Sequence, residues 1–194
     1  MGRRVHLDQV ERLFERSPVV TLSSVARLVG NSRYAKKLLH ELVKKGKLHR
    51  LTRGHYTLRE DPSLVVFCFQ PAYLGLQDAL SRHGVWEQET VPIVITARKV
   101  RPGIRSVLGS NVLVRRVEKR YYFGIELHEE GGIALPYSDL EKTFLDMLHF
   151  RQRLEGEPIR QLSGRIEMKK LRSYAGRFPA RVRKRALSLL HAAP

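Results

Sequence analysis

Residues 20–58 decide the fold of this 194-residue chain, and they read VTLSSVARLVGNSRYAKKLLHELVKKGKLHRLTRGHYTL. Within them, residues 32–45 carry hydrophobic side chains at positions i, i+3, i+4, i+7 and i+8, the spacing of the buried stripe of an α-helix. This stripe comprises Ala35, Leu38, Leu39, Leu42 and Val43. The opposite face is cationic, with Glu41 as its only acidic residue. Its cations are Arg33, Lys36, Lys37, His40, Lys44 and Lys45.

A shorter helix is predicted before this one, over residues 22–29. Thr21 is its expected N-cap, because the hydroxyl can accept a hydrogen bond from a backbone NH that has no helical partner. Gly30 and Asn31 suit the sharp turn between the helices, since glycine tolerates a positive φ and asparagine does so next best. Asn31 or Ser32 can also cap the second helix.

After the cationic helix, residues 46–58 read as a helix-terminating glycine, a strand, a turn and a second strand. Upstream, a helix is predicted over residues 8–16, with Asp8 as N-cap and Glu11 as its capping-box partner. Pro18 ends that helix. The order helix, helix, cationic helix and two-stranded wing is that of a winged helix-turn-helix, and the cationic helix is then the recognition helix.

In helix-turn-helix docking, the first residues of the recognition helix meet base edges and the others meet phosphates. We expect base contacts from Asn31, Ser32, Arg33, Lys36 and Lys37, with Tyr34 as a further candidate. We expect phosphate or minor-groove contacts from Lys44, Lys45, Lys47, Arg50 and Arg53, with His40 and His55 on the same surface. The alternative is a solvated basic face used for protein contacts. It is disfavoured because a solvated face normally mixes charges of both signs.

The formal net charge of +17 and the pI near 10.6 imply a polyanionic partner. The positive charge is concentrated at both ends of the chain. The first 60 residues contain 14 Lys and Arg against 5 Asp and Glu, residues 61–150 contain 10 against 11, and residues 151–194 contain 12 against 3. In the tail, the cluster comprises Arg177, Arg181, Arg183, Lys184 and Arg185. This second cluster is a solubilising helix face, a contact with flanking DNA, or a docking site for an acidic partner.

We expect two domains, divided at the charged, proline-containing stretch Arg59-Glu60-Asp61-Pro62. Residues 1–60 would form the winged helix-turn-helix, and residues 61–194 an α/β domain with a basic helical tail from about residue 151. The predicted fold class is α+β, with a small mixed or antiparallel sheet. The predicted strands are residues 64–69, 91–97, 111–117, 121–127 and 132–135. The predicted helices are residues 72–83, 138–150 with a Ser138/Glu141 capping box, 168–175 and 179–191.

The sequence offers little for metal, cofactor or covalent chemistry. Cys68, the only cysteine, lies in an apolar run, so it can form no internal disulfide and suits a core position in a reducing cytoplasm. No two histidines lie at ligand spacing beside a cysteine, and neither a phosphate-binding loop nor a Gly-x-Ser-x-Gly elbow is present. No apolar stretch approaches the roughly 20 residues that cross a bilayer, and the N-terminus lacks a secretory signal. We therefore expect a cytoplasmic protein that is not an enzyme and holds no metal or cofactor.

A nucleic-acid-processing enzyme is the alternative class, with the winged helix as a substrate clamp. Metal-dependent nucleases fix a divalent ion between carboxylates held by a sheet, near a lysine. Glu87 and Glu89 precede the predicted strand 91–97 and Lys99 follows it, so a degenerate site of this kind can be drawn. Acidic residues at strand edges are more often solvated or helix-capping, which favours a non-catalytic middle region.

Four segments in this order resemble the AbiEi-type antitoxin family, the regulator half of type IV toxin–antitoxin pairs. They are residues 51–56 (LTRGHY), 72–84 (AYLGLQDALSRHG), 92–96 (PIVIT) and 138–146 (SDLEKTFLD). The resemblance implies an N-terminal domain that binds double-stranded DNA and represses its own operon, usually at inverted repeats. It also implies a C-terminal domain that counteracts a nucleotidyltransferase-like toxin. Operators with inverted repeats would favour a homodimer.

Overall fold

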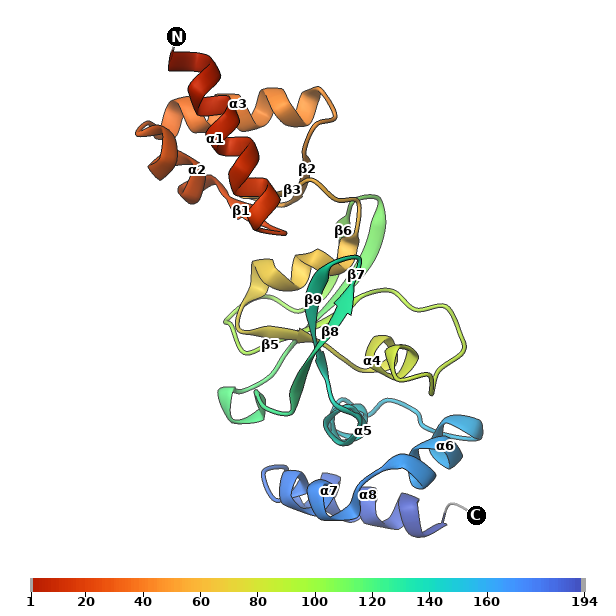
Figure 1. Ribbon diagram of the computed structural model, residues 1–194. Coiled ribbons are helices and arrows are strands. Elements are labelled where there is room, and N and C mark those ends of the chain that lie inside the picture. The colour runs from red at the N-terminus through yellow and green to blue at the C-terminus, as the bar shows by residue number, and fades with distance from the viewer. Residues whose placement is uncertain (1, 193–194) are drawn as a thin grey trace. The chain divides into compact units, whose positions relative to one another are not determined.

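The computed structural model describes the backbone of residues 2–192 and the side chains of residues 7–190 (Figure 1). The chain divides into two compact units. The N-terminal unit consists of the residues up to Cys68 together with Ser106–Asn111, and the C-terminal unit consists of Phe69–Arg105 and the residues from Val112 onward. The predicted α+β fold class is confirmed: helices and a small sheet come first, then a larger sheet and further helices.

The N-terminal unit comprises α1 (Gly2–Arg16), β1 (Val20–Thr21), α2 (Leu22–Val29), α3 (Ser32–Lys44), β2 (His49–Thr52) and β3 (His55–Thr57). Strand β3 lies between β1 and β2 and is antiparallel to both. The core is built from apolar residues of each helix and of the sheet, among them Val10, Phe14, Val25, Leu39 and Tyr56. This is the predicted order of a winged helix-turn-helix, with β1 as an added strand.

Helix α1 begins at Gly2, so the predicted start at Asp8 is wrong. Asp8 and Glu11 are exposed residues within the helix and form no capping box. No proline or further glycine occurs between Gly2 and Asp8, so helix propensity lets the helix extend toward the N-terminus. The predicted burial of Val10 and Phe14 is confirmed.

Residues 62–69 form a 3₁₀ helix, η1 (Pro62–Phe69), and the predicted strand over 64–69 is wrong. Pro62 fixes a helical φ at its first position, and the Asp61 carboxylate accepts a hydrogen bond from the Ser63 NH at 2.8 Å. An unbroken apolar run has no periodicity, so its sequence cannot distinguish a buried strand from a buried helix. Cys68 is buried as predicted, and burial raises the pKa of its thiol to about 11.

The larger sheet has the strand order β6-β7-β5-β4-β9-β8. Its strands are β4 (Ala72–Leu74), β5 (Ile93–Thr96), β6 (Gly103–Val107), β7 (Ser110–Arg116), β8 (Ile125–Glu130) and β9 (Ile133–Ser138). The sheet is mixed, one of the two predicted alternatives, because β4 pairs with β9 and β5 with β7 in parallel, whereas β4–β5 and β8–β9 are antiparallel. Strand β6 was not predicted.

The helical elements of the C-terminal unit are α4 (Gln77–Arg82), η2 (Lys119–Tyr121), α5 (Leu140–His149), α6 (Glu157–Arg165), α7 (Met168–Ala175) and α8 (Ala180–Ala192). Helix α5 lies between the sheet and the pair α7 and α8 (Figure 1). The strand predicted over 121–127 begins only at Ile125, because Tyr121 closes η2 and is buried. Helix α6 was missed, although Gly156 and Pro158 mark its start.

The helix predicted over residues 72–83 is wrong in its first half, where strand β4 stands. The break falls at Gly75 and Leu76, and Leu76 has a φ of 57°. The Gly75 NH donates to the Ile93 carbonyl at 2.9 Å, and a Cβ on Gly75 would lie 2.5 Å from Ile95 Cδ1. Glycine therefore permits the close approach of β4 to β5, and this strand pairing overrides the local helix propensity.

A buried ion pair anchors α5 to the sheet. Lys142 and Asp146, one turn apart on α5, are fully buried and in direct contact through the Lys142 Nζ and Asp146 Oδ1 atoms. Lys142 Nζ also donates to the Tyr73 hydroxyl at 2.7 Å, and that hydroxyl donates to Asp146 Oδ2 at 2.7 Å. Burial lowers the pKa of Lys142, which the neighbouring Asp146 carboxylate partly offsets. The triad closes a hydrogen-bonded ring between β4 and α5.

The first turn of α5 also holds α7. Asp139, and not the predicted Ser138, is the N-cap of α5 and accepts from the Lys142 NH at 2.8 Å. Its second oxygen lies 3.2 Å from Lys170 Nζ, and Glu141 lies 2.8 Å from the same nitrogen. Glu141 also accepts from the Glu167 NH at 2.9 Å. Burial alone would raise the pKa of Glu141, but these two donors lower it.

Five aromatic rings pack together beside the Lys142–Asp146 ion pair. Tyr121 stacks on Phe178 with ring centroids 4.9 Å apart, and His149 lies 4.9 Å from Tyr121. Phe123 lies 6.1 Å from Phe178, and Phe150 lies 5.3 Å from His149. We call these five rings the aromatic cluster.

Replacing Lys142 with Met should lower the free energy of unfolding of the C-terminal unit by about 3–5 kcal/mol, because Asp146 keeps a buried charge without its partner. Trp86 is the only tryptophan and packs against the core of this unit, so its fluorescence during urea unfolding reports the loss. The double variant Lys142→Met/Asp146→Leu should regain most of the stability. Equal destabilisation by the single and double variants would contradict this account.

Candidate nucleic-acid interface

The turn between α2 and α3 has the predicted geometry. Thr21 caps α2, its hydroxyl accepting from the Ser24 NH at 3.0 Å. Gly30 ends α2 with a φ of 69°, a conformation that favours glycine. Asn31 caps α3, its side-chain oxygen accepting from the Tyr34 NH at 2.9 Å. These contacts fix where α3 begins and therefore which side chains occupy its first turn.

Helix α3 separates its apolar and cationic faces as predicted. Ala35 and Leu39 are fully buried and Leu42 is nearly so, while Leu38 and Val43 are partly buried against the same core. The predicted cationic face is exposed: Arg33, Lys36, Lys37, His40 and Lys44 on the helix, and Lys45 at its C-cap. Asn31 and Ser32 are exposed at the start of the helix, and Tyr34 is partly buried.

The wing is formed by β2 and β3, joined at Arg53 and Gly54. Gly54 has a φ of 79°, and its carbonyl accepts from the Leu22 NH at 2.9 Å. This hydrogen bond connects the tip of the wing to the first residue of α2. The connection was not visible in the sequence, since it joins positions 32 residues apart.

Two wing side chains are held by neighbouring groups. Arg50 Nε donates to the Thr52 carbonyl at 3.3 Å, and His55 Nδ1 lies 3.1 Å from the Thr52 hydroxyl. Arg50 and Arg53 are exposed, as is Lys47 before β2, whereas His55 is half-buried. The sequence analysis did not predict that Thr52 would position Arg50 and His55. Its place beside the turn is the only feature of the sequence that indicates this contact.

The cations of α3 and of the wing are not neutralised within the part of the chain that the structure describes. None of Arg33, Lys36, Lys37, Lys44, Lys45, Lys47, Arg50 and Arg53 forms an ion pair among the described residues. Glu41, the acidic residue of α3, is only partly exposed. The N-terminal unit therefore presents positive charge that is free to meet an external anion.

The cations predicted in the tail lie on the C-terminal unit. Arg177 follows α7, and Arg181, Arg183, Lys184 and Arg185 lie on α8. All five are exposed, while Val182 and Ala186 of the same helix are buried. The predicted division of α8 into a basic and an apolar face is thus confirmed at these positions.

The two carboxylates considered for a nuclease site are exposed, and four further acidic residues of the C-terminal unit are already engaged. Glu87 and Glu89 are exposed in the loop between α4 and β5, and Lys99 is exposed after β5. Asp139, Glu141 and Asp146 bind the lysines and backbone groups already described, and Asp78 accepts from the Ile93 NH at 3.0 Å. Within residues 7–190, no three His, Cys, Asp or Glu side chains are placed to hold a metal ion together.

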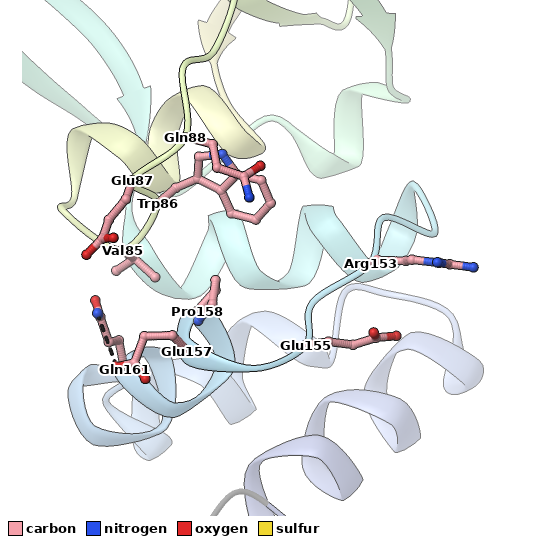
Figure 2. A pocket seen from close by; sticks show the side chains of 9 residues that line it. All are labelled: Val85, Trp86, Glu87, Gln88, Arg153, Glu155, Glu157, Pro158 and Gln161. Carbon is pink, nitrogen blue, oxygen red and sulfur yellow. Dashed lines mark hydrogen bonds between the residues drawn. The ribbon is translucent and has the colours of Figure 1, made fainter.

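A pocket of about 340 Å³ lies beside Trp86 in the C-terminal unit (Figure 2). Three carboxylates line it, from Glu87, Glu155 and Glu157. Glu87 and Glu155 extend from opposite sides of the pocket and point away from one another (Figure 2). Glu157 is engaged by Arg160 at 2.9 Å. The pocket therefore lacks the paired carboxylates that metal-dependent hydrolysis requires.

None of the helices described in residues 2–192 is both long and apolar enough to span a bilayer.

Comparison with known proteins bears on both units. Residues 8–59 match the model of a family described as "Transcriptional regulator, AbiEi antitoxin", which confirms the predicted resemblance over the winged helix-turn-helix. The crystal structure of the RV2827C protein from Mycobacterium tuberculosis matches over 99% of this chain and 76% of that chain, with a TM-score of 0.66 and 16% sequence identity. At that identity the match shows a shared fold. No curated protein matches the sequence.

Replacing Asn31 with Ala should lower the opening free energy of the first-turn amides of α3 by about 1 kcal/mol, because the helix loses its capping oxygen. Native-state hydrogen exchange measures this locally. Asn31→Asp keeps an acceptor in the same place and serves as the control, with exchange close to that of the wild type. Unchanged protection in Asn31→Ala would contradict the assigned cap.

Proposed function

We propose that this protein is a DNA-binding transcriptional regulator whose N-terminal unit binds an operator in double-stranded DNA. The observation that carries the proposal is the cationic face of α3, which is exposed, has no ion-pair partner among the described residues and lies on a helix whose start is fixed by two capped turns. The family match over residues 8–59 supports the same function.

In the proposed complex, α3 enters the major groove with its first turns toward the bases. Asn31, Ser32 and Arg33 open the helix, and Lys36 and Lys37 follow one turn later, so these residues contact base edges, with Tyr34 beside them. Lys44, Lys45 and Lys47 at the far end of α3 contact phosphates, with His40 on the same face. Arg50, Arg53 and His55 bring the wing against the adjacent backbone or minor groove.

The finer proposal is an autorepressing antitoxin of a type IV toxin–antitoxin pair, acting in the cytoplasm as a homodimer on inverted repeats. The partner would be a nucleotidyltransferase-like toxin, counteracted through the C-terminal unit. The family match supports an antitoxin or regulator, and the wing segment 51–56 falls inside it. The other segments that carry the resemblance, from residue 72 onward, lie beyond the matched residues.

DNA of the protein's own promoter should bind with an affinity that falls steeply with salt. If roughly six phosphates are neutralised, the slope of log affinity against log salt should be about −5. Arg33→Ala and Lys37→Ala should each lose about 1–3 kcal/mol of discrimination between the operator and a scrambled duplex. Lys44→Ala is the matched control, because loss of a phosphate contact weakens both duplexes alike and reduces the slope by about 1. Fluorescence anisotropy measures these quantities, and a flat salt response would refute DNA binding.

The antitoxin assignment is tested by co-expression with a nucleotidyltransferase-like protein from an adjacent gene. Growth arrest by that protein should be relieved by the full chain. It should also be relieved by the Arg33→Ala/Lys37→Ala variant, because neutralisation is assigned to the C-terminal unit. If neither chain restores growth, this protein is a regulator without antitoxin activity.

A further inference from the structure

The C-terminal unit places four arginines around its aromatic cluster. The Arg177 guanidinium lies 4.3 Å from the centre of the Phe123 ring, and the Arg120 guanidinium lies 4.9 Å from that of Tyr121. Arg115 lies 5.9 Å from the Phe150 ring. Arg181 is exposed at the start of α8, three residues after Phe178 of the cluster. The pKa of His149 is lowered, mainly by burial, and the positive charge of Arg181 contributes to the shift. Four separate segments thus bring cations to one set of rings.

The positive charges of these arginines are mostly not balanced by ion pairs among the described residues. Within the described residues, Arg115, Arg177 and Arg181 form no ion pair, and the buried Nε of Arg115 has no hydrogen-bond partner. Arg120 is paired with Glu118 at 3.1 Å, but both side chains remain more than half exposed. Two further carboxylates near these rings are already paired, Asp146 with Lys142 and Asp139 with Lys170. Arg116 and Lys119, which follow Arg115 and precede Arg120 in the chain, are also exposed.

A guanidinium that lies over an aromatic ring is fixed in orientation and keeps its edge NH groups for an external acceptor. Its outer face remains available for a flat partner. Tyr122, the residue after Tyr121, is 38% exposed, and its ring lies 6.1 Å from that of Tyr73. The surface therefore offers phosphate donors and stacking planes together, whereas a merely solubilising surface would need only the charges.

We propose that this surface, formed by Arg115, Arg120, Tyr122, Arg177 and Arg181, is a second nucleic-acid site that binds single-stranded RNA. Phosphates pair with the arginine edges, and unpaired bases stack on the guanidinium planes and on Tyr122. Duplex DNA fits less well because its base faces are hidden within the stack. An acidic protein would pair with the arginine charges but would not stack on the guanidinium planes or on Tyr122. The site is independent of the DNA-binding function proposed for the N-terminal unit.

The test measures binding of a fluorescein-labelled, unstructured RNA of about 12 nucleotides, within the site size of single-strand binders, to the full-length protein by fluorescence anisotropy. Arg177→Gln/Arg181→Gln should weaken RNA binding by about 10-fold or more, through lost phosphate and stacking contacts. The matched control is Lys169→Gln/Arg172→Gln, which removes two exposed cations of α7 that lie over no ring among the described residues and should change the affinity less than about 2-fold. Trp86 fluorescence confirms that each variant is folded.

Two further measurements keep the proposal testable without relying on the stability of that variant. Wild-type protein should bind an abasic RNA of the same length about 10-fold more weakly, because base stacking is lost. The Lys36→Gln/Lys37→Gln variant should retain RNA binding while losing duplex DNA, which separates this site from the N-terminal unit.

Several outcomes would overturn the RNA site. If Arg177→Gln/Arg181→Gln and its control lose RNA binding equally, the loss reflects only the lower net charge of the protein. Equal binding of abasic RNA, single-stranded DNA or duplex DNA at this surface would remove the RNA assignment. Unchanged RNA affinity in the cluster variant would leave the surface to an acidic protein partner.

Discussion

The C-terminal unit depends on a lysine that has no access to water. The ammonium group of Lys142 is balanced by Asp146 and surrounded by the rings of Tyr73, Phe123 and Phe178. A charge in such a place must be compensated, so β4, α5 and the segment before α8 are confined to one arrangement around it. The same turn of α5 holds α7 through Asp139 and Glu141. The charge of Lys142 is compensated only when each of its partners is in place. The ion pair therefore favours one packing of the helices, and its net contribution to stability is smaller.

The sequence was most informative where a local rule and the core agreed. In α2 and α3 the capping residues, the positive-φ glycine and the apolar spacing all indicated the same boundaries, and the structure has them except that α3 ends one residue earlier, at Lys44. It was least informative where a distant partner decides. Residues 72–74 begin a segment with a helical pattern, yet they form β4 because Gly75 lets the strand lie against Ile95. The unbroken apolar run at residues 64–69 has no helical or strand periodicity, so its sequence does not indicate which element it forms.

The candidate sites show the same division. The cations of α3 could be predicted because their face is defined by the stripe opposite them on the same helix. The arginine and aromatic surface could not, because its members come from β7, η2, the turn after α7 and α8, which only the tertiary fold brings together. Arg115 and Arg120 were absent from the predicted basic clusters for that reason. Lys142 and Asp146 stood in a segment predicted as a helix and noted for its family resemblance, but their pairing was not predicted. Both contact Tyr73, which is 69 residues from Lys142.

The hydrogen bond from the Leu22 NH to the Gly54 carbonyl has a consequence for how the N-terminal unit would sense a duplex. It joins the tip of the wing to the start of α2, and α2 is joined to α3 by a turn of defined geometry, so the distance between wing and recognition helix is set by the protein. A protein with a fixed distance between these two elements fits best to a duplex in which the major groove and the neighbouring backbone have the matching separation. In the proposed complex, sequences that differ only in groove width or stiffness would be distinguished at positions that no side chain touches.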